Sequence, residues 1–159
     1  MCCLVIGQGT QVAMDMYRCD EEIICDRTKI ENILKDTMTH FAMKEDALYL
    51  NDKEDEEDFT FILLYDGGHI FLHVFPDYGY AAADVFSQKE ESSPEEVAIY
   101  IRKKFSPDQS KLTVLQRGDF GSIADMKPRR KKMVKPIRRA KNAGATLKKL
   151  MLKSTNPND

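Results

Sequence analysis

Residues 59–87 read FTFILLYDGGHIFLHVFPDYGYAAADVFS and form the densest apolar segment of the chain. Three runs within it, Phe59 to Tyr65, His69 to Phe75 and Tyr80 to Ser87, have the composition and alternation of β-strands. The pair Gly67-Gly68 separates the first two runs, and Pro76-Asp77-Tyr78-Gly79 separates the last two. Both separators are typical of tight turns, so the segment predicts three consecutive antiparallel strands.

On the N-terminal side of this segment, Gln11 to Tyr17 alternates as a half-buried strand does. From Arg27 to about Met43 the apolar residues recur at helical spacing, and Asp26 is a plausible N-cap. Ala47 to Leu50 is compatible with a further short strand, but four residues are too few to distinguish a strand from a loop.

On the C-terminal side, Ser93-Pro94-Glu95-Glu96 is a capping box with proline at the first helical position. The helix that it opens places Val97, Tyr100, Ile101 and Phe105 on one face, and Lys111 to Arg117 follows as a last strand. The order β-α-β-β-β-α-β predicts an α+β fold. We expect a two-layer sandwich in which a mainly antiparallel sheet packs against two helices.

The 159 residues suit one domain with a tail, because 42% are hydrophobic and 31% are charged. No apolar run approaches the roughly 20 residues of a transmembrane helix. The opening residues show no basic leader followed by an apolar region, so we expect no secretory signal. Four cysteines in the first 25 residues lack C-x-x-C spacing, which favours reduced thiols in a cytoplasmic protein.

Charge divides the chain into two parts. Residues 1–125 contain 12 Lys and Arg against 25 Asp and Glu, a net charge of −13. Residues 126–159 contain 12 against 1, a net charge of +11. We therefore predict an acidic domain at 1–125 and a basic C-terminal tail at 126–159, partly helical from about Pro136. The acidic run Asp52 to Asp58 is interpreted as a solvated loop, because it lacks the ligand spacing of a metal site, and no metal is predicted.

The central motif resembles a known family. GHIFLHVFPDYGYAAADVFS (residues 68–87) is similar to the segment of prokaryotic S-adenosylmethionine decarboxylases that reads approximately E-S-H-(I/L)-x-(I/L)-H-x-(W/Y/F)-P-E-x-G-Y-A-(A/S)-(V/I)-D-V-(F/Y)-T-C. GTQVAMDMYRCD (residues 9–20) resembles the opening strand of that family, G-x-H-x-x-x-(D/E)-(L/F)-x-G-C, and Arg117-Gly118 resembles an R-G pair near its C-terminus. The resemblance covers roughly residues 5–120.

The resemblance implies a self-made cofactor, and this chain departs from it there. In the family a serine attacks the preceding glutamate, the chain breaks, and the new N-terminus becomes a pyruvoyl group that supports decarboxylation. Gly68 stands at the serine position and Gly67 at the glutamate position. Because glycine has no hydroxyl, we expect no pyruvoyl group and no other cofactor. The two glycines either form a tight hairpin or open space for an anionic ligand.

Other family positions differ as well. The cysteine that the resemblance would make a proton donor is Gln88, whose amide is no general acid near neutral pH. The early histidine is replaced by Gln11, and the glycine before Cys19 by Arg18. The family-equivalent catalytic positions are therefore Gly68, His73 and Gln88, and the residues at 68 and 88 lack the groups that react in the family.

His69, His73 and Asp77 remain as candidate ligand-binding residues. His73 matches a histidine that assists processing in the family, but a hydrogen-bonded strand histidine would look the same. Asp77 replaces the glutamate of P-E-x-G-Y, where it either approaches the ribose of a ligand or caps the turn.

Three functional hypotheses follow. The first is a non-catalytic relative, homodimeric as the resemblance implies, that binds S-adenosylmethionine or a related nucleoside or modulates a polyamine (spermidine) pathway enzyme. The second is an enzyme of the same fold that uses His69, His73 and Asp77 in acid–base chemistry without a pyruvoyl group. The third is a dimeric scaffold whose basic residues 127–153 bind nucleic acid or an anionic surface. Three other uses of the segment stay open: docking on an acidic partner, a mobile solvated extension, and a tail folded onto the acidic body of its own or a neighbouring chain.

Overall fold

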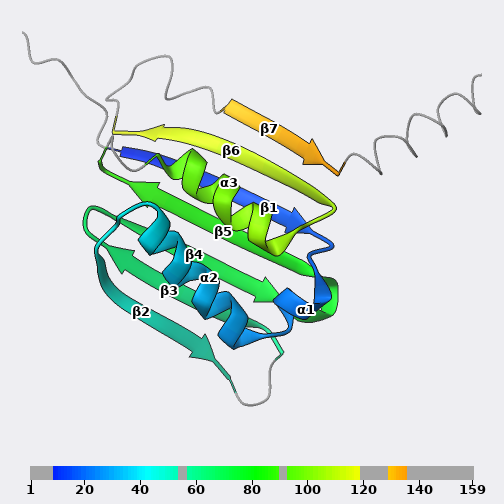
Figure 1. The fold of residues 1–159 in the computed structure, drawn as a ribbon. Helices are drawn as coiled ribbons and strands as arrows, with labels where there is room; N and C mark the ends of the chain where they lie inside the picture. Colours follow the sequence, from blue (N-terminus) through cyan, green and yellow to red (C-terminus); the bar gives the residue numbers. More distant parts are fainter. Residues whose placement is uncertain (1–8, 54–56, 90–92, 119–128, 136–159) are drawn as a thin grey trace, which may run out of the picture.

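The computed structural model describes residues 9–53, 57–89, 93–118 and 129–135. Seven strands form one antiparallel sheet in the order β2-β3-β4-β5-β1-β6-β7 (Figure 1). The strands are β1 (Gly9–Tyr17), β2 (Glu45–Asp52), β3 (Phe59–Tyr65), β4 (Gly68–Phe75), β5 (Tyr80–Ser87), β6 (Gln109–Arg117) and β7 (Arg129–Val134). The helices are α1 (Glu21–Ile24), α2 (Arg27–His40), the 3-10 turn η1 (Pro76–Tyr78) and α3 (Pro94–Phe105).

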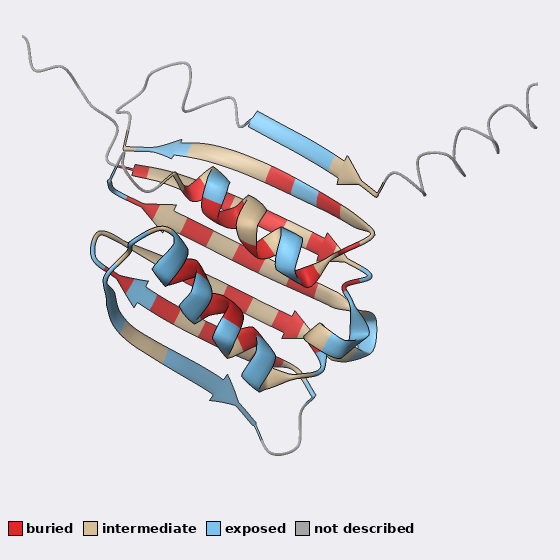
Figure 2. Cartoon of the chain, in the orientation of Figure 1, coloured by how far each residue is buried: buried red, intermediate tan, exposed pale blue. Residues whose placement is uncertain are grey.

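The helices α2 and α3 lie side by side over one face of the sheet, which we call the covered face (Figure 1). Strand residues alternate between buried and partly exposed, and the buried ones point to the helices (Figure 2). The opposite side, the open face, is covered by no element of the described chain. The expected α+β two-layer sandwich is confirmed.

The helix caps follow the predicted chemistry. The Asp26 side chain accepts a hydrogen bond from the Lys29 amide at 3.0 Å, and the Ser93 hydroxyl accepts one from the Glu96 amide at 3.4 Å. The helix α2 ends at His40, three residues before the predicted end, because Ala42 adopts a left-handed conformation with φ of 49°.

Two strands extend the sheet beyond the predicted pattern. The short strand considered at Ala47 to Leu50 is the eight-residue edge strand β2, and most of its residues are exposed. The strand β7 falls inside the predicted basic tail and pairs with β6 from Arg129 to Val134. Neither edge shows apolar alternation, because an edge strand packs few side chains against the core. The helix expected from Pro136 lies outside the described residues.

None of the helices in the described part of the chain combines the length and apolar character that a bilayer crossing requires.

Candidate functional site

A cavity of about 410 Å³ lies at one end of the sheet, and we call it the end cavity. The strands that build it are antiparallel, so the beginnings of β1 and β4 meet the ends of β5 and β6 there. Side chains that are far apart in sequence therefore come together. The lining residues are Gln11, His69, Phe86, Gln88, Arg117 and Gly118.

A chain of polar contacts runs along one side of the end cavity. The Arg117 guanidinium donates a hydrogen bond to the side-chain oxygen of Gln11. The Gln11 amide in turn donates to the Asp84 carboxylate at 3.4 Å. These contacts orient the Gln11 amide and hold a cationic group at the mouth of the cavity, which suits a ligand that carries a carboxylate.

His69 and Phe86 form an aromatic wall on the other side. Their ring centroids are 5.4 Å apart at an interplanar angle of 28°, and the Phe71 ring lies 4.8 Å from His69. Partial burial lowers the pKa of His69, while the Asp84 carboxylate acts in the opposite direction. The imidazole is therefore predominantly neutral at pH 7 and offers a flat, weakly polar surface for a heterocyclic ring.

The β3–β4 connection is a two-residue hairpin turn beside the cavity. Asp66 and Gly67 form the turn, Gly67 has a φ of 84°, and Tyr65 pairs with Gly68 across it. The hairpin interpretation of the two glycines is confirmed for Gly67, whereas Gly68 is already the first residue of β4. The backbone N–H of Gln88 donates to the Gly67 carbonyl at 2.8 Å, which fixes Gln88 next to the turn.

Gly68 has no room for a side chain. A Cβ at this position would lie 2.5 Å from two ring carbons of Tyr65, and closer still to the carbonyl oxygen of Phe86. The Tyr65 hydroxyl donates to that same carbonyl at 2.7 Å. Burial raises the pKa of Tyr65 to about 12, so the hydroxyl keeps its proton and this hydrogen bond. The tyrosine thus fills the space in front of Gly68.

His73 does not line the end cavity. It lies on the open face four residues beyond His69, where its Nδ1 is 3.0 Å from the Thr60 hydroxyl. The hydrogen-bonded strand histidine considered from the sequence matches this placement.

Asp77 lies beyond the other end of β4, in η1. There it borders a second cavity of about 580 Å³ with Arg18, Cys19 and Cys25. Because β4 is eight residues long, His69 and Asp77 are separated by most of its length, roughly 20 Å. Burial raises the pKa of the Cys19 thiol to about 12, so it is no nucleophile at neutral pH.

The acid–base hypothesis requires His69, His73 and Asp77 to share one site, and within one protomer they do not. Among the described residues, no three His, Cys, Asp or Glu side chains are arranged to hold a metal ion.

Sequence reasoning missed Tyr65, Asp84 and Phe86 as parts of this site. A usable signal was present for two of them, because residues 84 and 86 share the face of their strand and β5 runs next to β4. The contact between Tyr65 and Gly68 depends on the hairpin register, which the sequence pattern does not specify.

These features define the class as a small α+β sandwich protein with a ligand-sized cavity at one end of its sheet. The family model described as S-adenosylmethionine decarboxylase matches residues 10–118. The chain belongs to the S-adenosylmethionine decarboxylase family.

Individual relatives agree with this assignment. The S-adenosylmethionine decarboxylase proenzyme of Clostridium kluyveri is 26% identical over 121 residues, covering 75% of this chain and 94% of the relative. That of Pyrococcus furiosus is 30% identical over 110 residues, covering 69% and 78%. The crystal structure of the Aquifex aeolicus adenosylmethionine decarboxylase shares the fold, with a TM-score of 0.64, 21% identity, and 70% and 92% coverage.

Proposed function

We propose that this chain binds S-adenosylmethionine, or a nucleoside related to it, in the end cavity, and that it does so without a pyruvoyl group. The observation that carries the proposal is the convergence of motif positions. Gln11, His69, Gln88 and Arg117-Gly118 lie in or directly after the strands β1, β4, β5 and β6, and they line one cavity. His69 and Arg117-Gly118 keep the residue types of the family motif, whereas Gln11 and Gln88 replace its histidine and cysteine, so the cavity combines inherited groups with two unreactive amides.

Two observations on Gly68 support the absence of self-processing. Glycine offers no hydroxyl for attack on the preceding carbonyl, which is Gly67 in this chain. The Tyr65 ring and the Phe86 carbonyl also occupy the space that a serine side chain would need. The residues present therefore do not fit a pyruvoyl group, and we derive no chemical step from one.

The cavity offers complementary groups to the parts of the ligand. The neutral His69 ring and Phe86 give a flat surface for an adenine ring. Arg117 offers a guanidinium to the ligand carboxylate, and the side-chain amides of Gln11 and Gln88 offer donors and acceptors to its hydroxyl groups. A non-catalytic ligand-binding protein of this kind would act as a sensor or as an inactive partner of a polyamine-pathway enzyme.

A homodimer is part of the proposal and rests on the open face. Tyr49, Ile62, Leu64 and Phe71 form an apolar patch over β2, β3 and β4. Tyr49 is 58% exposed and Leu64 is 38% exposed. Large apolar side chains gathered on an uncovered sheet face favour burial against another surface, and a second copy provides a self-complementary one.

Isothermal titration calorimetry with S-adenosylmethionine tests the binding. We expect micromolar affinity for the full chain, at least tenfold weaker binding for Arg117→Ala, and no change for Lys103→Ala on the exposed face of α3. The same samples should release no carbon dioxide from the ligand. Absence of binding at millimolar ligand, or carbon dioxide release by the purified chain, would contradict the proposal.

A further inference from the structure

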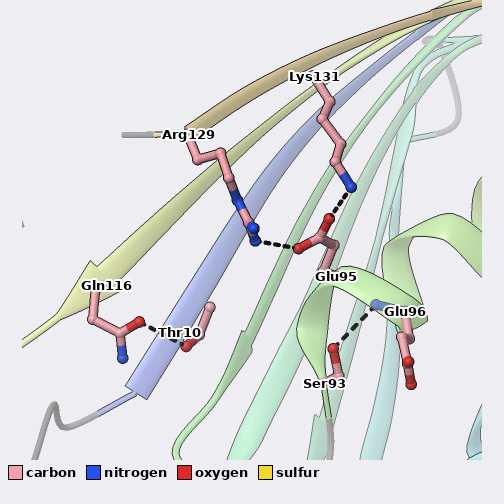
Figure 3. Close-up of polar contacts among 7 residues, drawn as sticks. All are labelled: Thr10, Ser93, Glu95, Glu96, Gln116, Arg129 and Lys131. Atoms are coloured by element: carbon pink, nitrogen blue, oxygen red, sulfur yellow. Dashed lines mark hydrogen bonds and ion pairs between the residues drawn. The ribbon is translucent and has the colours of Figure 1, made fainter. Parts of the chain in front are cut away.

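The strand β7 is a basic segment that the structure fixes at the edge of the sheet. It lies beyond residues 10–118, which the family model matches. On the covered face, Arg129 and Lys131 both form ion pairs with Glu95 in the first turn of α3 (Figure 3). The Glu95 side chain is only 18% exposed, and the two cations lie beside it at the start of α3.

Alternation along β7 places its other two cations on the opposite side. Arg130 and Lys132 point to the open face, where Lys132 lies directly opposite Lys111 of β6. We call Lys111, Arg130 and Lys132 the basic strip. Within the described part of the chain, no carboxylate forms an ion pair with any of the three.

Lys111 lies between two charged neighbours on this face, with Asp15 of β1 opposite it on one side and Lys132 of β7 on the other, so its charge is compensated on one side only. Like charges at directly opposed positions of two strands repel each other. Residues on one face of a strand are about 6.6 Å apart, which is close to the distance between successive phosphates of an extended nucleic acid strand. An anion with regularly spaced charges would relieve the repulsion between Lys111 and Lys132.

Aromatic rings lie next to the strip on the same face. The ammonium group of Lys111 lies 5.4 Å from the ring centroid of Tyr17. The Tyr17 ring is 5.3 Å from that of Tyr80, which is 5.5 Å from Phe75. All three rings are partly exposed. The basic C-terminal segment has no aromatic residue after Phe120, so the fold supplies the stacking surface that the segment itself lacks.

We propose that the basic strip and Tyr17 form a binding surface for single-stranded nucleic acid. The phosphates follow Arg130, Lys132 and Lys111, and a base stacks on Tyr17. Cations beside partly exposed rings are the combination by which sheet surfaces bind unpaired strands. The rings also favour a nucleic acid over a lipid surface, because the strip has no protruding apolar anchor. The surface is distinct from the end cavity and does not depend on the proposed function.

Fluorescence anisotropy with a labelled oligouridylate of about a dozen nucleotides tests the proposal on the full chain across a salt series. Each phosphate contact contributes about −0.7 to the slope of log K against log salt, so the three strip cations contribute about −2. We expect the triple variant K111Q/R130Q/K132Q to bind more weakly and to lose about 2 from the magnitude of that slope.

The matched control removes three exposed cations from the helices, K29Q/K35Q/K103Q, and should leave the slope unchanged. Tyr17→Leu should weaken binding about tenfold without changing the slope, because stacking releases no counterions. Vesicles of phosphatidylserine and phosphatidylcholine provide the lipid arm and should bind no more strongly to the wild type than to the triple variant.

Three results would overturn the proposal. The first is no binding of the oligonucleotide at low salt. The second is equal affinity and slope for the wild type and the triple variant, which would assign binding to other basic residues. The third is strip-dependent binding of the vesicles with no binding of the oligonucleotide.

Discussion

Gly68 stands at the position of the processing serine of the family, and the fold leaves no room there for a side chain. Restoring a serine there tests whether the site still accepts one. We expect Gly68→Ser to lower the free energy of unfolding by about 1–3 kcal/mol, because the new Cβ would overlap the Tyr65 ring and the Phe86 carbonyl. Urea denaturation followed by circular dichroism measures the loss.

Ala82→Ser is a suitable control, because it adds the same hydroxyl to a partly exposed position of the neighbouring strand β5. We expect the control to change stability by less than about 0.5 kcal/mol. A Gly68→Ser variant as stable as the wild type, or one that cleaves itself, would show that the space in front of residue 68 is open.

His69 provides a second test at the residue scale. Its pKa is lowered by burial, so we expect its titration by NMR below the ordinary value of about 6.5. Since the Asp84 carboxylate raises this pKa, Asp84→Asn should move it further down. The fold favours the neutral imidazole of His69. Its contribution to the free energy of unfolding is therefore fully present above pH 6.5 and is lost as the pH falls through the lowered pKa. A His69 pKa at or above 6.5 would contradict this account of the cavity.

At the scale of the elements, the central strands and the two long helices were predictable from the sequence. Their apolar periodicity is strong because β3, β4 and β5 bury every second side chain against α2 and α3. Capping residues such as Asp26 and Ser93 also mark the helix starts locally.

The edge strands were predictable only in part. The strand β2 is exposed along most of its length, and β7 begins with four charged residues in succession, so neither shows the alternation of a half-buried strand. The short helix α1 is a single turn and has no periodicity to detect. These elements are determined by pairing with a neighbour, which a local pattern does not contain.

The candidate site was predictable to a similar extent. The family motif includes the positions of His69, Gln88 and Arg117, and these residues line one cavity. It also grouped His73 and Asp77 with His69, whereas the strand direction separates Asp77 from the cavity by the length of β4. The predicted strand from His69 to Phe75 already implied that separation, because Asp77 lies in the turn after it. The sequence pattern did not contain the strand pairing that brings Gln88 and Arg117 next to His69.

At the scale of the whole molecule, the proposed dimer uses the apolar patch on the open face. We expect Leu64→Glu to convert the proposed dimer to a monomer without unfolding it, because a buried carboxylate in the apolar patch is costly while an exposed one is not. Light scattering coupled to size exclusion measures the mass, and circular dichroism checks the fold.

Tyr78→Glu places the same charge on an exposed side chain in η1 and should leave the assembly unchanged. A wild-type chain that is monomeric at micromolar concentration, or a Leu64→Glu variant that stays dimeric, would rule out this face as the interface.

The most direct test of the central claim is the mass of the purified full-length chain under denaturing conditions. The claim is that this family member retains the ligand cavity but does not cleave itself to make a pyruvoyl group. We predict one uncut species of 18.2 kDa. Two fragments, the second with a blocked N-terminus derived from a serine elsewhere in the chain, would contradict it.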